Sequence, residues 1–576
     1  MSARAIAGAE PQVECSEIEG RAVVPGSGAG PVLLADEPLS FWGGVDPATG
    51  RVIDTHHPLL GKTVSGSVLV MPTSRGSCSG SGVLLDLILR DRGPAALVFC
   101  EDEDVLTLGA LVAKHLFGRN LPVIQLGADA FAALAASPRA EVHEDALLAG
   151  ALCVSLCPLT AAALDLTPTE RDMLAGGDGP ATREAIRIVI AMALKQGARR
   201  LVDVRRAHID GCIYASPANL TFAERMVALG ARVIVPTTTN AISVDLAHWR
   251  AQGVPDAFGS PAARLAEAYL AMGCAPSFTC APQLLPDAPC RGEVLAWAES
   301  NAVVFANSVI GARSAKHPDF LDLCMAVTGR APLAGVYLDE GRRPGCVIEV
   351  EAVELPDDAF WPLLGWVAGR RSGNRIPLLT GLDATNPDQD DLKALCAAFG
   401  TTAGAAMLHV AGVTPESGVP PLPGAERIGI TRAELRSAWA SLNDGPEAVD
   451  LVAIGSPHAS SEECRRLATV LDERQCRVKT RVMVMVGRAT LADIAADGTL
   501  ARLSASGVTV LPDLCWCSIT EPVFPPDSRT VVTTSGKYAH YGPGLSGRAV
   551  RLASLSECAK AALTGRLPPA TPDWLR

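Results

Sequence analysis

Short apolar segments separated by glycine-rich turns predict a β/α domain in the first part of the chain. Strand-like runs lie at 21–35, 66–72, 95–100 and 121–127, and helical patterns lie at 84–89 and 105–117. Turn signals such as Asp91-Arg92-Gly93-Pro94 separate these runs. The pattern indicates a compact unit at 20–150, preceded by a poorly ordered tail at 1–19.

The rest of the chain, 160–576, continues the alternation of strand and helix, which predicts a large unit built on mostly parallel sheets. A division into two α/β lobes is expected near 430–445. Loops at the carboxyl ends of parallel strands share one edge of a sheet and build sites there. The strands expected to end in polar loops are LVDV at 201–204, RVIVP at 232–236, VDLVAIG at 449–455, GVTVLPDLC at 507–515 and the segment from 531.

Composition narrows the class of partner. The 576 residues are 48% hydrophobic and 19% charged, which is typical of a packed globular enzyme. The formal charge is −12 and Lys and Arg are spread thinly, so nucleic acid and anionic membranes are not expected as partners. We find no apolar run of membrane-spanning length and no secretory signal pattern, so we expect a cytoplasmic protein that acts on a small molecule.

The stretch 278–313 gathers reactive and polar side chains between apolar segments. It holds Cys280, the run Glu299-Ser300-Asn301, Asn307 and Arg313. Polar groups at the ends of apolar elements are delivered into a largely dry space, which is what a preorganised site requires. Taken alone, Cys280 is better explained as a buried thiol of the core, and the neighbouring polar side chains shift the balance towards a site.

Cysteine usage does not indicate a disulfide framework. The 17 cysteines are scattered, and several, such as Cys324 and Cys396, lie in apolar contexts typical of core packing. Cys515-Trp516-Cys517 is the one tight pair. On an extended strand both sulfurs share a face, so they either bind one metal or cluster or pack together in a core.

The loop from Met71 to Gly82 is rich in serine and glycine and joins a strand to a helix. Free N–H groups and hydroxyls at a helix N-terminus suit a carboxylate or an alkoxide, and Arg75 adds a possible clamp. The alternative is an N-cap loop without chemistry. The segment lacks the Gly-Lys ending of a phosphate-binding loop. His208 and the run Thr237–Asn240 likewise have a structural alternative.

Six segments together resemble the aconitase X family. They are TCAP at 279–282, ESNAVVFANSVIGAR at 299–313, GRAP at 329–332, IGSPHAS at 454–460, Asp513-x-Cys515 and SGKYAHY at 535–541. The resemblance covers nearly all of the chain from about Gly20. It implies an α/β fold in which an N-terminal swivelling β/α domain precedes an aconitase-like, multi-domain large unit with parallel sheets. Ser77 stands where aconitase-type enzymes place a catalytic serine.

The resemblance also implies an iron–sulfur cluster held by three thiolates. Cys280 and Cys515 match two of the family's cysteine positions. The third position falls at Ser456, where the phosphomevalonate-type relatives have cysteine, and Cys517 is the candidate for the missing thiolate. A [2Fe-2S] centre is therefore preferred over [4Fe-4S] or [3Fe-4S].

The implied activity is that of an iron–sulfur-dependent hydro-lyase. Fusion of the two domains and the missing phosphate signature favour cis-3-hydroxy-L-proline as substrate and Δ1-pyrroline-2-carboxylate as product. Mevalonate 5-phosphate or another hydroxy acid is the alternative. Loss of the C2 proton and of the C3 hydroxyl requires a base, an electrophile and a carboxylate clamp.

Within this resemblance Ser77 is the expected base, acting as an alkoxide, and Lys537 and His208 are the alternatives. The residues expected to bind substrate are Ser74, Arg75, Thr238, Asn240, Glu299, Ser300, Asn301, Asn307, Arg313, His458 and Tyr538. We expect a monomer. Two other classes of function are a cluster-free lyase whose cysteines pack in a core and a non-catalytic, cluster-carrying regulatory protein; the acidic balance speaks against nucleic-acid regulation.

Overall fold

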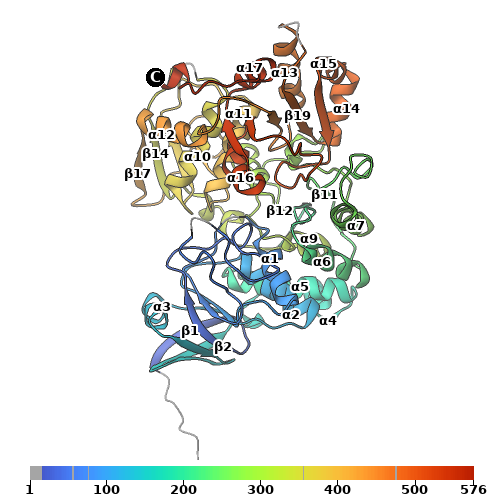
Figure 1. The fold of residues 1–576 in the computed structure, drawn as a ribbon. Coiled ribbons are helices and arrows are strands. Elements are labelled where there is room, and N and C mark those ends of the chain that lie inside the picture. Colours follow the sequence, from blue (N-terminus) through green and yellow to red (C-terminus); the bar gives the residue numbers. More distant parts are fainter. Residues whose placement is uncertain (1–15, 55–56, 76, 355, 474–476) are drawn as a thin grey trace, which may run out of the picture. The chain divides into compact units, whose positions relative to one another are not determined.

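The computed structural model describes residues 16–54, 57–75, 77–354, 356–473 and 477–576 (Figure 1). These residues form two compact units. The first contains residues up to 75 together with 84–160, and the second contains 76–83 together with 161–576. Most of the predicted tail, residues 1–15, lies outside the described residues, and the first strand begins at Ser16.

The first unit is a closed barrel of eight strands in the order β1-β5-β4-β3-β2-β6-β7-β8. The strands are β1 (Ser16–Val24), β2 (Gly28–Leu34), β3 (Val68–Val70), β4 (Ala96–Phe99), β5 (Val123–Gln125), β6 (Arg139–Val142), β7 (Ala146–Ala149) and β8 (Leu152–Pro158). Alternate residues such as Val68, Val70 and Val98 fill its interior, as the two-residue period of a strand requires. The helices are α2 (Val105–Phe117) and α3 (Ala128–Ala135), and the division between the units falls inside α1 (Gly80–Leu89).

The second unit contains four sheets. They have the orders β11-β10-β12, β13-β9, β16-β15-β14-β17 and β20-β19-β18-β21-β22. All their strand pairs are parallel except β13–β9. The strands are β9 (Leu201–Asp203), β10 (Arg206–Ile209), β11 (Thr237–Thr239), β12 (Leu295–Trp297), β13 (Arg330–Pro332), β14 (Cys346–Val350), β15 (Pro377–Thr380), β16 (His409–Val410), β17 (Glu426–Ile430), β18 (Leu451–Ile454), β19 (Arg481–Val486), β20 (Val508–Pro512), β21 (Thr530–Thr533) and β22 (Ala549–Leu552). The predicted α/β class with mostly parallel sheets is confirmed.

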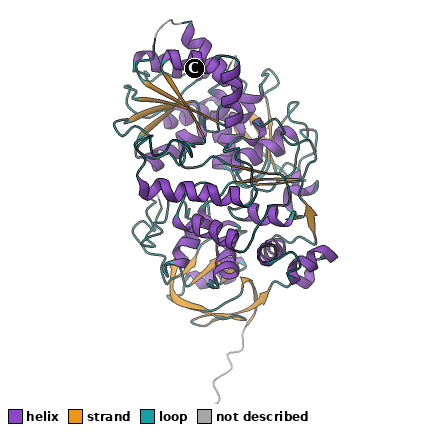
Figure 2. Ribbon diagram, turned by 90° about the vertical axis from the view of Figure 1, so that its right-hand side faces the viewer, coloured by secondary structure: helices purple, strands orange, loops and turns teal. Residues whose placement is uncertain are grey.

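Helices connect these parallel strands, and Figure 2 shows the strands lying among them. They are α4 (Pro168–Ala175), α5 (Pro180–Lys195), α6 (Pro217–Ala228), α7 (Asp256–Ala271), α8 (Ser300–Phe305), α9 (Leu321–Thr328), α10 (Phe360–Ser372), α11 (Gln389–Thr402), α12 (Arg432–Leu442), α13 (Ser461–Asp472), α14 (Arg488–Ala496), α15 (Thr499–Ser506), α16 (Gly536–Ser546) and α17 (Leu555–Thr564). Within the described residues, no helix is both long and apolar enough to cross a membrane.

One predicted strand is wrong. Residues 232–236 are irregular, and the strand in this region is β11, which begins at Thr237. The backbone N–H groups of Val233 and Ile234 donate to two different segments, at Met272 and Ala326. Ile234 is 60% exposed, so the apolar run that suggested a buried strand does not lie in the core. The polar Thr237–Thr239 run forms the strand instead, because both of its edges pair or bond within the unit.

Candidate active site

Three cysteines from distant segments lie together in the second unit. Cys280 and Cys515 are 1% and 2% exposed and pack with Ala241 and the half-buried Cys517. Cys280 lies shortly after Ala275, which forms an isolated bridge with Thr238 of β11. The other two cysteines lie directly after β20. Both interpretations of the Cys515-Trp516-Cys517 pair, a metal site and core packing, place the two sulfurs together, and the structure adds Cys280 to them. We call these three residues the cysteine cluster.

Backbone N–H groups hold two of these sulfurs. The N–H of His458 donates to Cys280 Sγ at 3.2 Å, and the N–H of Cys517 donates to Cys515 Sγ at 3.4 Å. Hydrogen bonds of this kind stabilise thiolates and tune iron–sulfur centres. Three soft sulfur donors with N–H support fit an iron–sulfur group better than a hard cation, which prefers oxygen.

The IGSPHAS loop runs from β18 to the N-cap of α13, where Ser460 forms a capping box with Glu463. His458 Nε2 donates to the Leu514 carbonyl at 2.7 Å, so Nδ1 accepts from Thr279 Oγ1 at 3.2 Å. Burial lowers the pKa of His458 to about 4, which keeps the ring neutral. His458 therefore fastens the loop to the segments that carry the cysteines.

Ser456, in the same loop, is 4% exposed, and its hydroxyl makes no hydrogen bond with the described residues. The hydroxyl of Tyr538 likewise has no partner among the described residues. Its ring is buried, with its centroid 5.4 Å from that of Trp516. Buried hydroxyls without partners are uncommon and point to a ligand or water that completes them. Both observations suit the predicted roles of these residues.

A buried ion pair lies beside the cysteine cluster. Lys537 Nζ, in the first turn of α16, donates to Glu299 Oε1 at 2.8 Å, and Asn301 Nδ2 donates to the same oxygen at 2.6 Å. Burial raises the pKa of Glu299, but the Lys537 ammonium and the amide hydrogen bonds outweigh burial and lower it to about 2. The charges of Glu299 and the cysteines outweigh the burial of Lys537 and raise its pKa. Lys537 is therefore protonated, so it can donate hydrogen bonds but cannot accept a proton in this state.

Asn240 connects this ion pair to a second polar region. Its Nδ2 group donates to Glu299 Oε2 at 3.0 Å and to Asp210 Oδ1. On the other side of Asp210, the thiol of Cys78 donates to Oδ2 at 2.8 Å. Ser77, the predicted base, lies next to Cys78 with its hydroxyl 3.9 Å from the sulfur. A continuous polar network thus joins Ser77 to Lys537.

His208 is the remaining candidate base. Its Nδ1 atom lies 2.8 Å from the hydroxyl of Thr238, another predicted site residue, and its Nε2 atom has no partner among the described residues. Burial lowers the pKa of His208 to about 4, so the ring is neutral and able to accept a proton. Ser300 begins α8 beside Glu299 and is half-buried.

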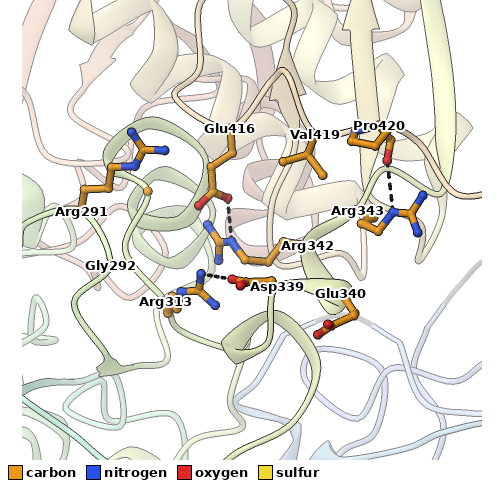
Figure 3. A pocket seen from close by; sticks show the side chains of 11 residues that line it. Arg291, Gly292, Arg313, Asp339, Glu340, Arg342, Arg343, Glu416, Val419 and Pro420 are labelled. Atoms are coloured by element: carbon orange, nitrogen blue, oxygen red, sulfur yellow. Dashed lines mark hydrogen bonds and ion pairs between the residues drawn. The ribbon is translucent and has the colours of Figure 1, made fainter.

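The structure places two predicted substrate residues elsewhere. Asn307 donates its amide to the carbonyls of Ser314 and Ala406 and accepts from the Ser314 N–H and the Arg342 guanidinium, so both of its side-chain polar atoms have partners. Arg313 donates to Asp339 and to the Tyr337 carbonyl. Arg313 lines a cavity of about 610 Å³ that contains other arginines but none of the cysteines (Figure 3). Neither side chain contacts the polar network.

Ser74 and Arg75 belong to the first unit. Ser74 Oγ donates to Glu103 Oε1 at 2.6 Å, and the Arg75 guanidinium pairs with Asp54 at 3.1 Å and Glu37 at 3.6 Å. Both side chains therefore have partners within their own unit. Their predicted contact with substrate stays a prediction.

Two buried residues in this region were not predicted. Asp319 is 2% exposed and Asp322 is fully buried, and an Asp322 oxygen accepts the backbone N–H of Asp210 at 2.7 Å. A carboxylate oxygen of Asp319 lies within 4.8 Å of Cys78 Sγ and of Asp210. We call Asp210, Asp319 and Asp322 the aspartate cluster. Asp210 directly follows β10, whereas the sequence predicted only the preceding strand, at 201–204.

Together these features define a class of protein. A multi-domain α/β unit with parallel sheets carries a buried cysteine cluster, a protonated lysine and a serine joined by one polar network. Soft ligands for a Lewis acid, a proton donor and a hydroxyl nucleophile or base are the groups that an elimination reaction needs. The arrangement fits a lyase that uses an iron–sulfur group.

Comparison with known proteins agrees with this class. The aconitase X swivel domain matches residues 17–149, and the first, second and third aconitase X domains match 163–340, 344–440 and 449–564. The chain is 49% identical to cis-3-hydroxy-L-proline dehydratase of Pseudomonas aeruginosa, over 96% of this chain and 98% of that protein. It is 46% identical to the enzyme of the same name from Hypocrea jecorina, over 97% of each chain.

More distant relatives match only part of the chain. The phosphomevalonate dehydratase large subunit of Methanothermobacter thermautotrophicus is 33% identical over 66% of this chain and 94% of that subunit. The crystal structure of aconitase X from Thermococcus kodakaraensis, in its holo-form, has a TM-score of 0.64 and 31% identity, covering 69% of this chain and all of that one. The chain belongs to the aconitase X family, as its motifs predict. Membership of this family implies an iron–sulfur cluster.

Proposed function

We propose that this chain is a hydro-lyase that converts cis-3-hydroxy-L-proline into Δ1-pyrroline-2-carboxylate. The observation that carries the proposal is the near-complete overlap with two single-chain relatives that bear this activity in their names. The phosphomevalonate relatives match the second unit as a separate large subunit. The amino-acid substrate is therefore favoured over mevalonate 5-phosphate, which remains the second candidate.

The reaction breaks the C2–H and C3–O bonds, forms a C2=C3 bond and releases water. The enamine formed first moves its N–H proton to C3 and becomes the cyclic imine. An iron–sulfur cluster, when bound, supplies Lewis acidity toward the C3 hydroxyl. We assign to Lys537, held protonated by Glu299, the role of stabilising the departing oxygen by charge and hydrogen bonding.

We assign the cluster ligands to Cys280, Cys515 and Cys517 and the cluster type to [2Fe-2S]. Support for the ligands comes from the packing of the three sulfurs, and the preference for [2Fe-2S] rests on the serine at position 456, which replaces the third thiolate of the family pattern. The assignment leaves the buried Ser456 hydroxyl free to face a ligand.

Removal of the C2 proton is assigned to Ser77. Its hydroxyl lies at one end of the polar network and the cysteine cluster lies beside the other end, so a substrate between them has its two faces toward different groups. In the cis isomer the C2 proton and the C3 hydroxyl lie on opposite ring faces, which fits this separation for an anti elimination. A serine needs help to lose its proton, and the nearby N–H of Ser79, 3.3 Å from Ser77 Oγ, is one such group. We also propose that the protein acts as a monomer in the cytoplasm.

The direct test is an assay of protein purified without oxygen and reconstituted with iron and sulfide. The substrates are the cis and trans isomers of 3-hydroxy-L-proline, trans-4-hydroxy-L-proline and mevalonate 5-phosphate. Formation of Δ1-pyrroline-2-carboxylate from the cis-3 isomer, trapped by borohydride as proline, is the expected result. Turnover of mevalonate 5-phosphate alone would contradict the proposal, and no turnover of any compound would favour a non-catalytic role.

A further inference from the structure

The aspartate cluster brings three buried carboxyl groups together without a matching cation from the described residues. Asp210 is 5% exposed, Asp319 2% and Asp322 not at all. Within the described residues, no lysine, arginine or histidine forms an ion pair with any of the three. Placing a carboxylate away from water is costly unless a proton, a metal or a cation compensates it. We therefore expect a positively charged ligand to bind at the cluster, because none of the described side chains supplies the charge.

The hydrogen bonds show which oxygen is left for such a group. Both oxygens of Asp322 accept backbone N–H groups, those of Asp210 and Leu323, each at 2.7 Å. Both oxygens of Asp210 accept from side chains, Asn240 and Cys78. Oδ1 of Asp319 has no hydrogen-bond partner among the described residues. The open acceptor in the cluster is thus on Asp319.

The ammonium of Lys316 is not the missing cation. It interacts electrostatically with Cys78, yet its Nζ atom donates to the carbonyls of Gly400 and Ala403 at 3.0 and 2.9 Å. Lys537, the other ammonium of the region, is committed to Glu299. The protein therefore satisfies its own buried ammonium groups with other acceptors and leaves Asp319 open.

We propose that Asp319, supported by Asp210, accepts the N–H groups of the substrate's ring ammonium and thereby selects an amino acid over a phosphorylated hydroxy acid. This inference rests on the proposed function. The ring nitrogen of a 3-hydroxyproline is bonded to C2, so a group that binds the nitrogen must lie close to the base that acts at C2. The Cys78 thiol lies between Asp210 and Ser77: it donates to Asp210 at 2.8 Å, and its sulfur lies 3.9 Å from the Ser77 hydroxyl. The cluster is therefore close to the proposed base.

The carboxyl groups of the cluster explain why an amino acid would be preferred over a phosphorylated hydroxy acid. A secondary ammonium carries one positive charge and two N–H donors, which match two carboxylates sharing a site. Burial and the neighbouring charges raise the pKa of both Asp210 and Asp319 in the free protein, so each gains from a cation that replaces a bound proton. A phosphate carries up to two negative charges and would be repelled by the same groups.

The test compares two ligands of equal shape, L-proline and cyclopentanecarboxylate, which differ in the ring nitrogen. Dissociation constants are measured by calorimetry with the reconstituted wild type, Asp319→Asn, Asp210→Asn and Asp527→Asn. Asp527 is an exposed carboxylate paired with Arg481 and serves as the matched control. The wild type and the control are expected to prefer L-proline by about 10-fold or more, as is usual for a charge-assisted hydrogen bond, and Asp319→Asn should bring this ratio close to one.

Three outcomes overturn the proposal. The first is a wild type that does not prefer L-proline, which needs no variant to be folded. The second is an unchanged preference in folded Asp319→Asn and Asp210→Asn. The third is a bound metal, detected by elemental analysis in addition to the cluster iron and lost in Asp319→Asn. A wild type that turns over no hydroxyproline and binds neither ligand would instead refute the proposed function, so the two failures are distinguishable.

Discussion

The cysteine cluster and the aspartate cluster lie in the same unit, at the two ends of one polar network, but burial affects them in opposite ways. A neutral thiol is readily buried, so Cys280 and Cys515 are compatible with a packed core whether or not a ligand is present. A carboxylate is costly to bury, so Asp210 and Asp319 require a partner. Geometry and donor type therefore support the proposed role of the cysteines as ligands, whereas the cost of burial supports the proposed role of the aspartates.

The variant Cys280→Ser is the strongest test of the proposal that the cysteines bind the cluster. Loss of one thiolate should remove the visible absorbance and the iron and abolish activity. Cys396, which is fully buried in another core, provides the matched variant, and Cys396→Ser should keep its colour. An iron content in Cys280→Ser equal to that of the wild type would show that the cysteine cluster is only core packing.

The ion pair between the clusters is tested by Lys537→Met. Removal of the ammonium leaves Glu299 buried and unpaired, so the free energy of unfolding in urea should fall by about 3–5 kcal/mol. Lys560→Met is the control, because its pair with Glu557 is exposed and contributes about 0–1 kcal/mol. Equal losses in both variants would mean that the Glu299 pair is not buried in solution.

The aspartate cluster predicts a pH dependence of stability. Burial and the charge of Asp319 raise the pKa of Asp322 from 3.8 to about 7. The folded state then holds a proton that the unfolded state releases, so the contribution of Asp322 is complete below about pH 4 and is lost as the pH rises to about 7. Between these values the stability of the wild type relative to Asp322→Asn should fall by an amount of the order of 4 kcal/mol. Urea unfolding at several pH values measures this difference, and a rise with pH would contradict it.

Ser77→Ala tests the link between the network and catalysis. Loss of a general base should reduce kcat by about 100-fold, and the absorbance of the cluster should not change because Ser77 is not a ligand. Exchange of the C2 proton in D2O is the decisive measurement. Exchange at the wild-type rate would move the role of base to His208, whose Nε2 atom is unpartnered among the described residues.

Arg313→Ala should have the smallest effect. The guanidinium lies in the arginine-lined cavity and pairs with an exposed aspartate, Asp339. The variant is expected to change kcat/KM by about two-fold or less and stability by about 0–1 kcal/mol. An increase of KM by an order of magnitude, without the same increase in Asp339→Ala, would return Arg313 to the substrate site.

The cysteines of the cluster could be singled out from the sequence because they lie in motifs that resemble those of the aconitase X family. The aspartate cluster could not. Asp319 and Asp322 lie in HPDFLD, a segment typical of a helix start, and their burial depends on the approach of Asp210 and Cys78, more than 100 residues earlier. Arg313 illustrates the converse limit, since Glu299 and Asn301 of the same motif lie at the ion pair while the Arg313 side chain pairs with Asp339. A motif fixes which residues are adjacent in sequence, not which side chains share a space.

The distance along the chain between Glu299 and Lys537, 238 residues, has a consequence for synthesis. A growing chain that has reached β12 and α8 already contains Glu299 and Cys280 but neither the lysine nor the two other cysteines. Contacts between such distant segments form late, because the intervening chain must first be ordered. The Glu299–Lys537 pair and the cysteine cluster can therefore be completed only after residue 537 has left the ribosome. Metal loading of this family member is expected to follow folding rather than guide it.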